Sequence, residues 1–241
     1  MQYYEFYIMG IVLLPAIILS IVAEAKVKTA YKQNMEVLSQ KGIVAHEVAE
    51  YILENQGIKD VTVARIGGEL NDYYSDKEKT VALSQDIYNS TSVAAIGIAL
   101  HEVGHAIQYH QGYKMVSFRN LMVKVCNLSS KILWPLVVIG LLLNLAVVGG
   151  GVLGEICLWS GIGFFGLSVI FNLVTLPVEF DASNRAKSIM QKENLLTKEE
   201  FDGASAVLNA AAWTYVAALM VSVMNLVRFL LVVILNSKNR D

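Results

Sequence analysis

The chain has 241 residues, of which 55% are hydrophobic and 17% are charged, and its mean hydropathy is +0.49. It is too apolar for an ordinary soluble domain and too charged for a bundle of helices buried entirely in lipid. The net charge is −2, and no basic cluster is interleaved with aromatic residues, which excludes nucleic acid as a partner. Two cysteines are too few for a disulfide framework or a cysteine-rich zinc site. The composition predicts a membrane protein with a sizeable water-exposed part.

Lys and Arg are absent from two long stretches of the chain. None of the 19 basic residues falls in residues 1–25, and none falls between Lys131 and Arg185. A membrane-spanning helix needs ~20 mainly apolar residues, so the first stretch predicts one span at about 6–23. The second stretch is long enough for two spans with a break near 149–155.

A fourth apolar run, at about 211–235, is also long enough to span a membrane, with Arg228 inside it. The first run has one feature of a secretory signal, because "AEA" at 23–25 looks like a small-residue cleavage site. However, its first five residues, "MQYYE", contain no Lys or Arg, which signal peptides normally carry. We therefore expect an uncleaved anchor and about four transmembrane helices.

Basic residues gather on one side of the predicted spans. They follow the first span and precede the second, whereas the connection between the second and third spans has none. Loops rich in Lys and Arg stay in the cytoplasm, so we expect 26–131 and about 179–205 to face the cytosol. The C-terminus, with Lys238 and Arg240, then falls outside, against the same rule. The fourth run is therefore alternatively a re-entrant or interfacial segment.

The segment 26–131 is long enough for one small domain. A helix with apolar residues at helical spacing is predicted to end at Gly57. Two short strands follow, at 61–66 and 79–84, and we expect them to form a β-hairpin. A mostly buried helix, capped by the Ser-Thr-Ser run before it, is then predicted to stop near Gly112. The pattern indicates a small α+β domain.

The last of these helices contains "HEVGH" at His101–His105. Histidines four residues apart project from one helix face, so both rings can bind one zinc ion. Glu102 points toward a metal-held water, where it acts as general base. Three of the four histidines fall in one decapeptide, and an isolated Glu102 is expensive to bury on an apolar helix. We interpret the pentapeptide as a metal site.

A similar pentapeptide, "HEVAE", places His46 and Glu50 on one face of an amphipathic helix. No other histidine is near, so we interpret this pair as a polar contact on a solvated helix face. His110 comes five residues after His105, which takes it off the ligand face, and we expect it at the helix end.

A catalytic zinc site needs three protein ligands and one open position. The third ligand must lie on the same side of the membrane as His101, and two spans return the chain to that side. Glu179 and Asp181 are the first carboxylates after the predicted third span, so either is a candidate.

The sequence resembles the YugP-type neutral zinc metallopeptidases of bacterial membranes nearly from end to end. The residues that carry this resemblance are "TVALS" at 80–84, "SVAAIGIALHEVGHAIQYHQGY" at 92–113, "LVTLPVEFDASNRA" at 173–186 and "AVLNAAAWTYVAALMVSVMNLVRFL" at 206–230. The resemblance implies a multi-pass zinc peptidase of the bacterial inner membrane, with one zinc ion per chain. The sequence departs from the family at Tyr73, where histidine is more common.

The family in turn resembles HtpX-type membrane proteases, in which a glutamate in an "ExxAD"-like run is the third zinc ligand. In "EFDAS" this correspondence implies Glu179 as the ligand. Ser183 stands where the relatives have aspartate, so the resemblance supports no role for it beside the ligands. Asp181 then either orients a zinc-bound imidazole or forms an ion pair with Arg185, one helical turn away.

These inferences predict a gluzincin-type metalloendopeptidase whose site faces the cytoplasm. Zinc lowers the pKa of its water, and Glu102 passes the proton to the leaving amine. Arg185, Asn184 and Tyr109 are candidates for stabilising the oxyanion. We expect the strand at 79–84 to pair with extended polypeptide substrates. By analogy with membrane proteases, the expected substrates are misfolded or membrane-tethered polypeptides, and the expected role is membrane-protein quality control.

The alternative is a zinc-binding but inactive membrane scaffold or adaptor, against which Glu102 argues, because a structural zinc site has no use for a base. An intramembrane protease would bury the motif in a full span, yet only "VAAIGIAL" precedes it. A metal transporter needs ionisable residues inside its spans, and these contain only Arg228 and the turn residue Glu155.

The predicted fold is a mainly α integral membrane protein with a small α+β gluzincin-like catalytic domain. Five segments are expected: a transmembrane anchor at 1–25, a cytosolic zinc-peptidase domain at 26–131, a transmembrane hairpin at 132–177, a cytosolic segment with the third zinc ligand at 178–206, and a C-terminal membrane helix and tail at 207–241.

Overall fold

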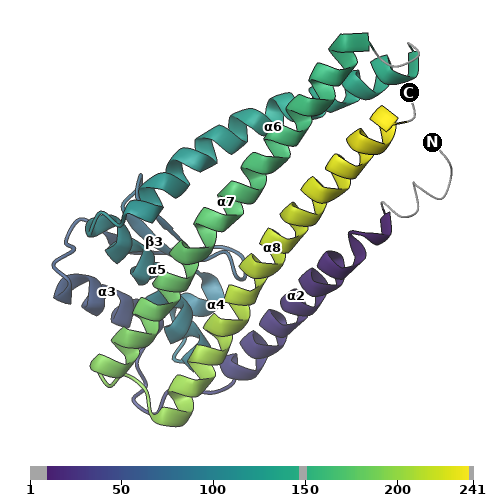
Figure 1. The fold of residues 1–241 in the computed structure, drawn as a ribbon. Helices are drawn as coiled ribbons and strands as arrows, with labels where there is room; N and C mark the ends of the chain where they lie inside the picture. The colour runs from purple at the N-terminus through teal and green to yellow at the C-terminus, as the bar shows by residue number, and fades with distance from the viewer. Residues whose placement is uncertain (1–9, 147–150, 239–241) are drawn as a thin grey trace. The chain divides into compact units, whose positions relative to one another are not determined.

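The computed structural model describes residues 10–146 and 151–238, and Figure 1 traces their elements in chain order. Contacts divide the chain into two compact units. We call them the helical unit (Met1–Ile21, Phe118–Thr175 and Tyr215–Asp241) and the α/β unit (Val22–Ser117 and Leu176–Thr214).

Apart from residues 10–13, four long helices supply the described residues of the helical unit, and all four continue into the α/β unit. They are α2 (Leu14–Met35), α6 (Lys114–Ala146), α7 (Gly151–Lys192) and α8 (Lys198–Lys238). Within the described residues, the stretches long and apolar enough to cross a membrane are Trp159–Lys192 and Lys198–Leu231.

Two such helices are therefore found, where about four were expected. The described part of the expected first span, 10–23, and the apolar run 132–146 of α6 are each shorter than the ~20 residues that a span needs. The remaining parts of these two predicted spans include 6–9 and 147–150, which lie outside the described residues.

The α/β unit contains a three-stranded sheet that is packed against α3, α4 and α5. In chain order its elements are α3 (Ala45–Asn55), β1 (Thr62–Ile66), β2 (Tyr73–Ser75), β3 (Thr80–Ser84), α4 (Gln85–Tyr88) and α5 (Val93–His110), followed by parts of the long helices. The strand order is β1-β3-β2. β1 pairs parallel with β3 from Thr62↔Thr80 to Ile66↔Ser84, and β2 pairs antiparallel with β3.

The predicted hairpin between the first and last strands is therefore wrong. The hairpin joins β2 to β3, and β2 forms from the polar segment between the two predicted strands. β3 is the central strand, with both edges paired, which excludes it as a strand that pairs with substrate. Its last four residues are buried, as a central strand requires.

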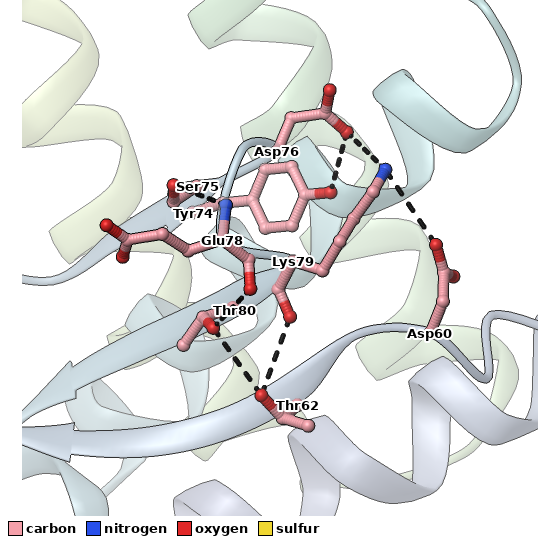
Figure 2. A network of polar contacts seen from close by, with 8 residues as sticks. All are labelled: Asp60, Thr62, Tyr74, Ser75, Asp76, Glu78, Lys79 and Thr80. Carbon is pink, nitrogen blue, oxygen red and sulfur yellow. Dashed lines mark hydrogen bonds and ion pairs between the residues drawn. The ribbon is translucent and has the colours of Figure 1, made fainter.

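A polar network holds the β2–β3 turn against the start of β1 (Figure 2). Lys79 Nζ lies 2.6 Å from Asp76 Oδ1 and 3.8 Å from Asp60 Oδ2. The Tyr74 hydroxyl donates to Asp76 at 3.2 Å. Exposed ion pairs contribute only about 0–1 kcal/mol each, so the network orients the turn more than it stabilises the unit.

α5 is the central helix of the α/β unit. Its N-cap, Ser92, accepts a hydrogen bond from the Ala95 N–H at 3.1 Å, as the Ser-Thr-Ser run predicted. Side chains such as Ile96, Leu100 and Val103 are fully buried, and a helix that is apolar on all sides belongs in a core.

The expected cytosolic segment at 178–206 is helical except for a short connection at 193–197. α7 continues through Pro177 to Lys192, and α8 begins at Lys198. Residues of both helices, including Met190 and Leu208, join the hydrophobic core that surrounds α5. The helical continuation fixes the carboxylates after Pro177 against α5.

Candidate metal centre

Three side chains with metal-ligating atoms converge between α5 and α7. His101 and His105 lie one turn apart on α5, and the Nε2 atom of each is 3.4 Å from Glu179 Oε2 on α7. Their ligand atoms all lie within 4.8 Å of one another. Among the described residues this is the only such group of three or more His, Cys, Asp or Glu side chains.

The donor set fits a zinc ion. Two imidazole nitrogens and one carboxylate oxygen are typical ligands of catalytic zinc, which keeps its fourth position open. The two rings are nearly perpendicular, at 84°, with centroids 4.8 Å apart. Glu179 is 3% exposed, and a buried carboxylate needs a positive partner.

The electrostatics of the site favour positive charge. Burial alone would lower the pKa of His105, but the hydrogen bond and charge of Glu179, the charge of Glu102 and a hydrogen bond to Gln108 together raise it above its usual value. The same negative surroundings favour a bound cation.

A close approach of backbones brings Glu179 within reach of the histidines. A Cβ atom added to Gly104, which lies between His101 and His105, would be 2.7 Å from the carbonyl oxygen of Ala182. Ala182 follows Glu179 by one turn of α7. The glycine of "HEVGH" therefore allows α7 to pack directly on the metal face of α5.

We expect Gly104→Ala to lower the free energy of unfolding by about 1–3 kcal/mol, because the added methyl group overpacks the α5–α7 contact. It should also weaken zinc binding, since α7 and Glu179 must move away from the histidines. Thermal denaturation and zinc competition titration measure the two effects.

Gly97→Ala is the matched control on the same helix. Its Cβ would meet the Ala204 side chain at 3.4 Å, an ordinary contact distance. Alanine also has the higher helix propensity, by about 1 kcal/mol. We expect this variant to be neutral or slightly stabilising, and equal behaviour of the two variants would contradict the packing argument.

The Nδ1 atom of each imidazole, which is not the nitrogen that faces Glu179, has a hydrogen-bond partner. His105 Nδ1 lies 2.9 Å from Gln108 Oε1, and His101 Nδ1 lies 3.1 Å from Ser183 Oγ. Such contacts orient metal-ligating histidines. The family resemblance supported no role for Ser183 beside the ligands, and that inference is corrected, because its hydroxyl contacts His101 Nδ1.

Asp181 combines parts of both roles considered for it. It accepts a hydrogen bond from Arg185 Nε at 2.6 Å, and it accepts another from Gln108 Nε2 at 2.8 Å. It therefore contacts His105 only through Gln108. Sequence reasoning missed Gln108, although a polar residue one turn after His105, on a helix expected to be buried, was a usable signal.

Two further carboxylates interact electrostatically, Glu102 beside His101 in the chain and Asp72, whose pKa the charge of Glu102 affects. Glu102 is buried on α5, 8% exposed. Asp72, which precedes β2, accepts a hydrogen bond from the Ser84 N–H at 2.7 Å. Burial raises the pKa of Asp72 to about 6 against the lowering effect of this bond, and the charge of Glu102 adds to the rise. Asp72 was not among the predicted site residues.

The three candidates for oxyanion stabilisation have different surroundings. Arg185 donates to Asp181 and, through Nη1, to Gln111 Oε1 at 2.7 Å. Asn184 is exposed on α7. The ring of Tyr109 lies 5.3 Å from that of Tyr74, at an angle of 60°.

The lookalike "HEVAE" has a different environment. His46 Nδ1 lies 2.8 Å from the carbonyl oxygen of Tyr88, and the two rings stack 4.2 Å apart. Glu50 is exposed. His46 is therefore half-buried against Tyr88, where a solvated face was predicted. His110 is the last residue of α5, as expected.

Comparison with known proteins agrees with this centre. The profile of the family described as "Putative neutral zinc metallopeptidase" matches residues 9–234. The chain is 38% identical over 224 residues to "Putative membrane protease YugP" of Bacillus subtilis (strain 168), covering 92% of this chain and 95% of that protein. No solved structure matches the chain significantly. With the family profile spanning almost its whole length, the chain belongs to this zinc metallopeptidase family.

Proposed function

We propose that the protein is a membrane-bound, zinc-dependent endopeptidase of the gluzincin type. The convergence of His101, His105 and Glu179 supports this proposal most strongly. Two further observations support the proposal. The chain belongs to a zinc metallopeptidase family, and the "HEVGH" motif supplies a glutamate next to the first histidine.

His101, His105 and Glu179 would hold one zinc ion per chain. When bound, zinc supplies a Lewis acid and lowers the pKa of a coordinated water. Glu102 accepts a proton from the attacking water and later donates it to the leaving amine. Arg185, one of the candidates for stabilising the oxyanion, donates hydrogen bonds to Asp181 and Gln111.

The substrate is an extended polypeptide that pairs with the edge of the sheet. Of the two edge strands, β2 (Tyr73–Ser75) contacts α5, the helix that carries the two histidines. Main-chain pairing to a strand edge gives affinity with broad tolerance for side chains. This assignment replaces the central strand β3, whose edges are both occupied.

The proposed location is the bacterial inner membrane, with the metal centre on the cytoplasmic side. The apolar run of α7 ends directly before Glu179, and the basic residues of 26–131 follow the positive-inside rule. Misfolded or membrane-tethered chains at this surface are the proposed substrates, which would place the enzyme in membrane-protein quality control.

Metal removal tests this function. Full-length protein in detergent is expected to contain about one zinc per chain and to cleave an unfolded soluble reporter or a membrane-tethered one. A zinc chelator should abolish cleavage, and added zinc should restore it. Protein without zinc, or with cleavage that survives complete zinc removal, would overturn the proposal. Bound zinc with neither reporter cleaved would favour the inactive scaffold.

A further inference from the structure

Gln108 connects the two helices that carry the candidate ligands. Its side chain is fully buried on α5, one turn after His105. Oε1 lies 2.9 Å from His105 Nδ1, whereas Nε2 lies 2.8 Å from the carbonyl oxygen of Val178 and 2.8 Å from Asp181 Oδ2. Every polar atom of this buried amide therefore has a partner.

The partners on α7 determine which way the amide faces. A carbonyl oxygen and a carboxylate oxygen only accept hydrogen bonds, so the NH2 group of Gln108 must point to Val178 and Asp181. The amide oxygen then faces the imidazole, and it only accepts. His105 Nδ1 must therefore carry a hydrogen. This leaves Nε2 as the ring nitrogen that can bind a metal.

Ser183 imposes no such restriction on the other histidine. Its hydroxyl can donate to His101 Nδ1 or accept from it. Of the two ring contacts, only the one from Gln108 requires a hydrogen on Nδ1.

Gln108 also restrains the third ligand. Val178, whose carbonyl oxygen it binds, directly precedes Glu179. Asp181 is held in turn by Arg185, which reaches back to Gln111 just after α5. One side chain thus links the ring of His105 to the backbone beside Glu179.

We propose that Gln108 is the positioning residue of the metal centre. It holds His105 in the Nδ1–H form and sets the His105 ring against the α7 turn that carries Glu179. This inference rests on the proposed metal binding by His101, His105 and Glu179. Loss of a group that orients a metal ligand typically weakens metal affinity about 10–100-fold.

Zinc competition titration of the full-length protein in detergent tests this role without measuring peptidase activity. Gln108→Met keeps the length of the side chain and removes its hydrogen bonds, and we expect zinc affinity to fall about 10–100-fold. The absorption spectrum of the cobalt-substituted variant should change as well, since the ligand geometry loosens. Wild-type affinity in a folded Gln108→Met variant would overturn the proposal.

A swap of the two groups provides a test that remains valid if Gln108→Met fails to fold. Gln108→Glu alone places a carboxylate oxygen against both Asp181 and the carbonyl oxygen of Val178, and we expect it to weaken zinc binding. Adding Asp181→Asn restores a donor facing an acceptor at one of these two contacts, so the double variant should bind zinc more tightly than the single one. Equal or weaker binding would overturn the proposal. Wild-type protein that binds no zinc would instead overturn the proposed function itself.

Discussion

Glu102→Gln is expected to reduce peptide hydrolysis by about 10²–10⁴-fold, the contribution of a positioned general base, while the protein keeps its zinc. Glu102 is buried next to His101, but it is not one of the three converging donors. The amide of glutamine has the same shape and cannot take up a proton at the pH of the reaction. Steady-state cleavage of a reporter and zinc content, measured on the same preparation, separate chemistry from metal binding.

The lookalike motif provides the matched control for this variant. Glu47 occupies the position in "HEVAE" that Glu102 occupies in "HEVGH", and it is exposed on α3. We expect Glu47→Gln to leave hydrolysis and zinc content unchanged. Wild-type turnover in Glu102→Gln would remove Glu102 from the mechanism, and loss of zinc would make it part of the binding site.

Local signals predicted the central helix well and the sheet poorly. The end of α5 and its Ser92 cap follow from residues next to one another in the chain. The pairing of β1 with β3 involves two strands separated by β2, and nothing in either strand distinguishes a parallel neighbour from an antiparallel one. β2 has three residues in a polar segment, too few for an alternating pattern to stand out.

The candidate site, too, has a part that local sequence patterns predicted and a part that depends on long-range packing. The spacing of His101 and His105 on one helix is a local pattern, and the helix places both rings together. Glu179 was suggested by the side of the membrane and by family resemblance. The contacts of Gln108 and Ser183 depend on how closely α7 packs on α5, which Gly104 permits, and no pattern within one helix reports that distance.

Glu179→Ala should lower zinc affinity by roughly a hundredfold or more, because loss of a ligand costs at least as much as the 10–100-fold loss caused by disturbing the groups that orient one. Peptidase activity should disappear with the metal. Zinc content after gel filtration and competition titration check the first effect, and reporter cleavage checks the second. Glu193→Ala, at an exposed glutamate directly after the end of the same helix, is the matched control and should behave as wild type.

The outcome for Glu179 decides the position of the third ligand. Asp181 is two residues away, but it accepts hydrogen bonds from Gln108 and Arg185 and contacts neither imidazole directly. If Glu179→Ala retained its zinc fully, another group would have to bind the metal in place of Glu179. For Asp181 this would mean breaking its hydrogen bonds with Gln108 and Arg185. Loss of zinc in Glu179→Ala, together with only a partial decrease in Asp181→Asn, would instead give the two carboxylates of "EFDAS" separate tasks. Glu179 would bind the metal, and Asp181 would hold the amide that orients His105.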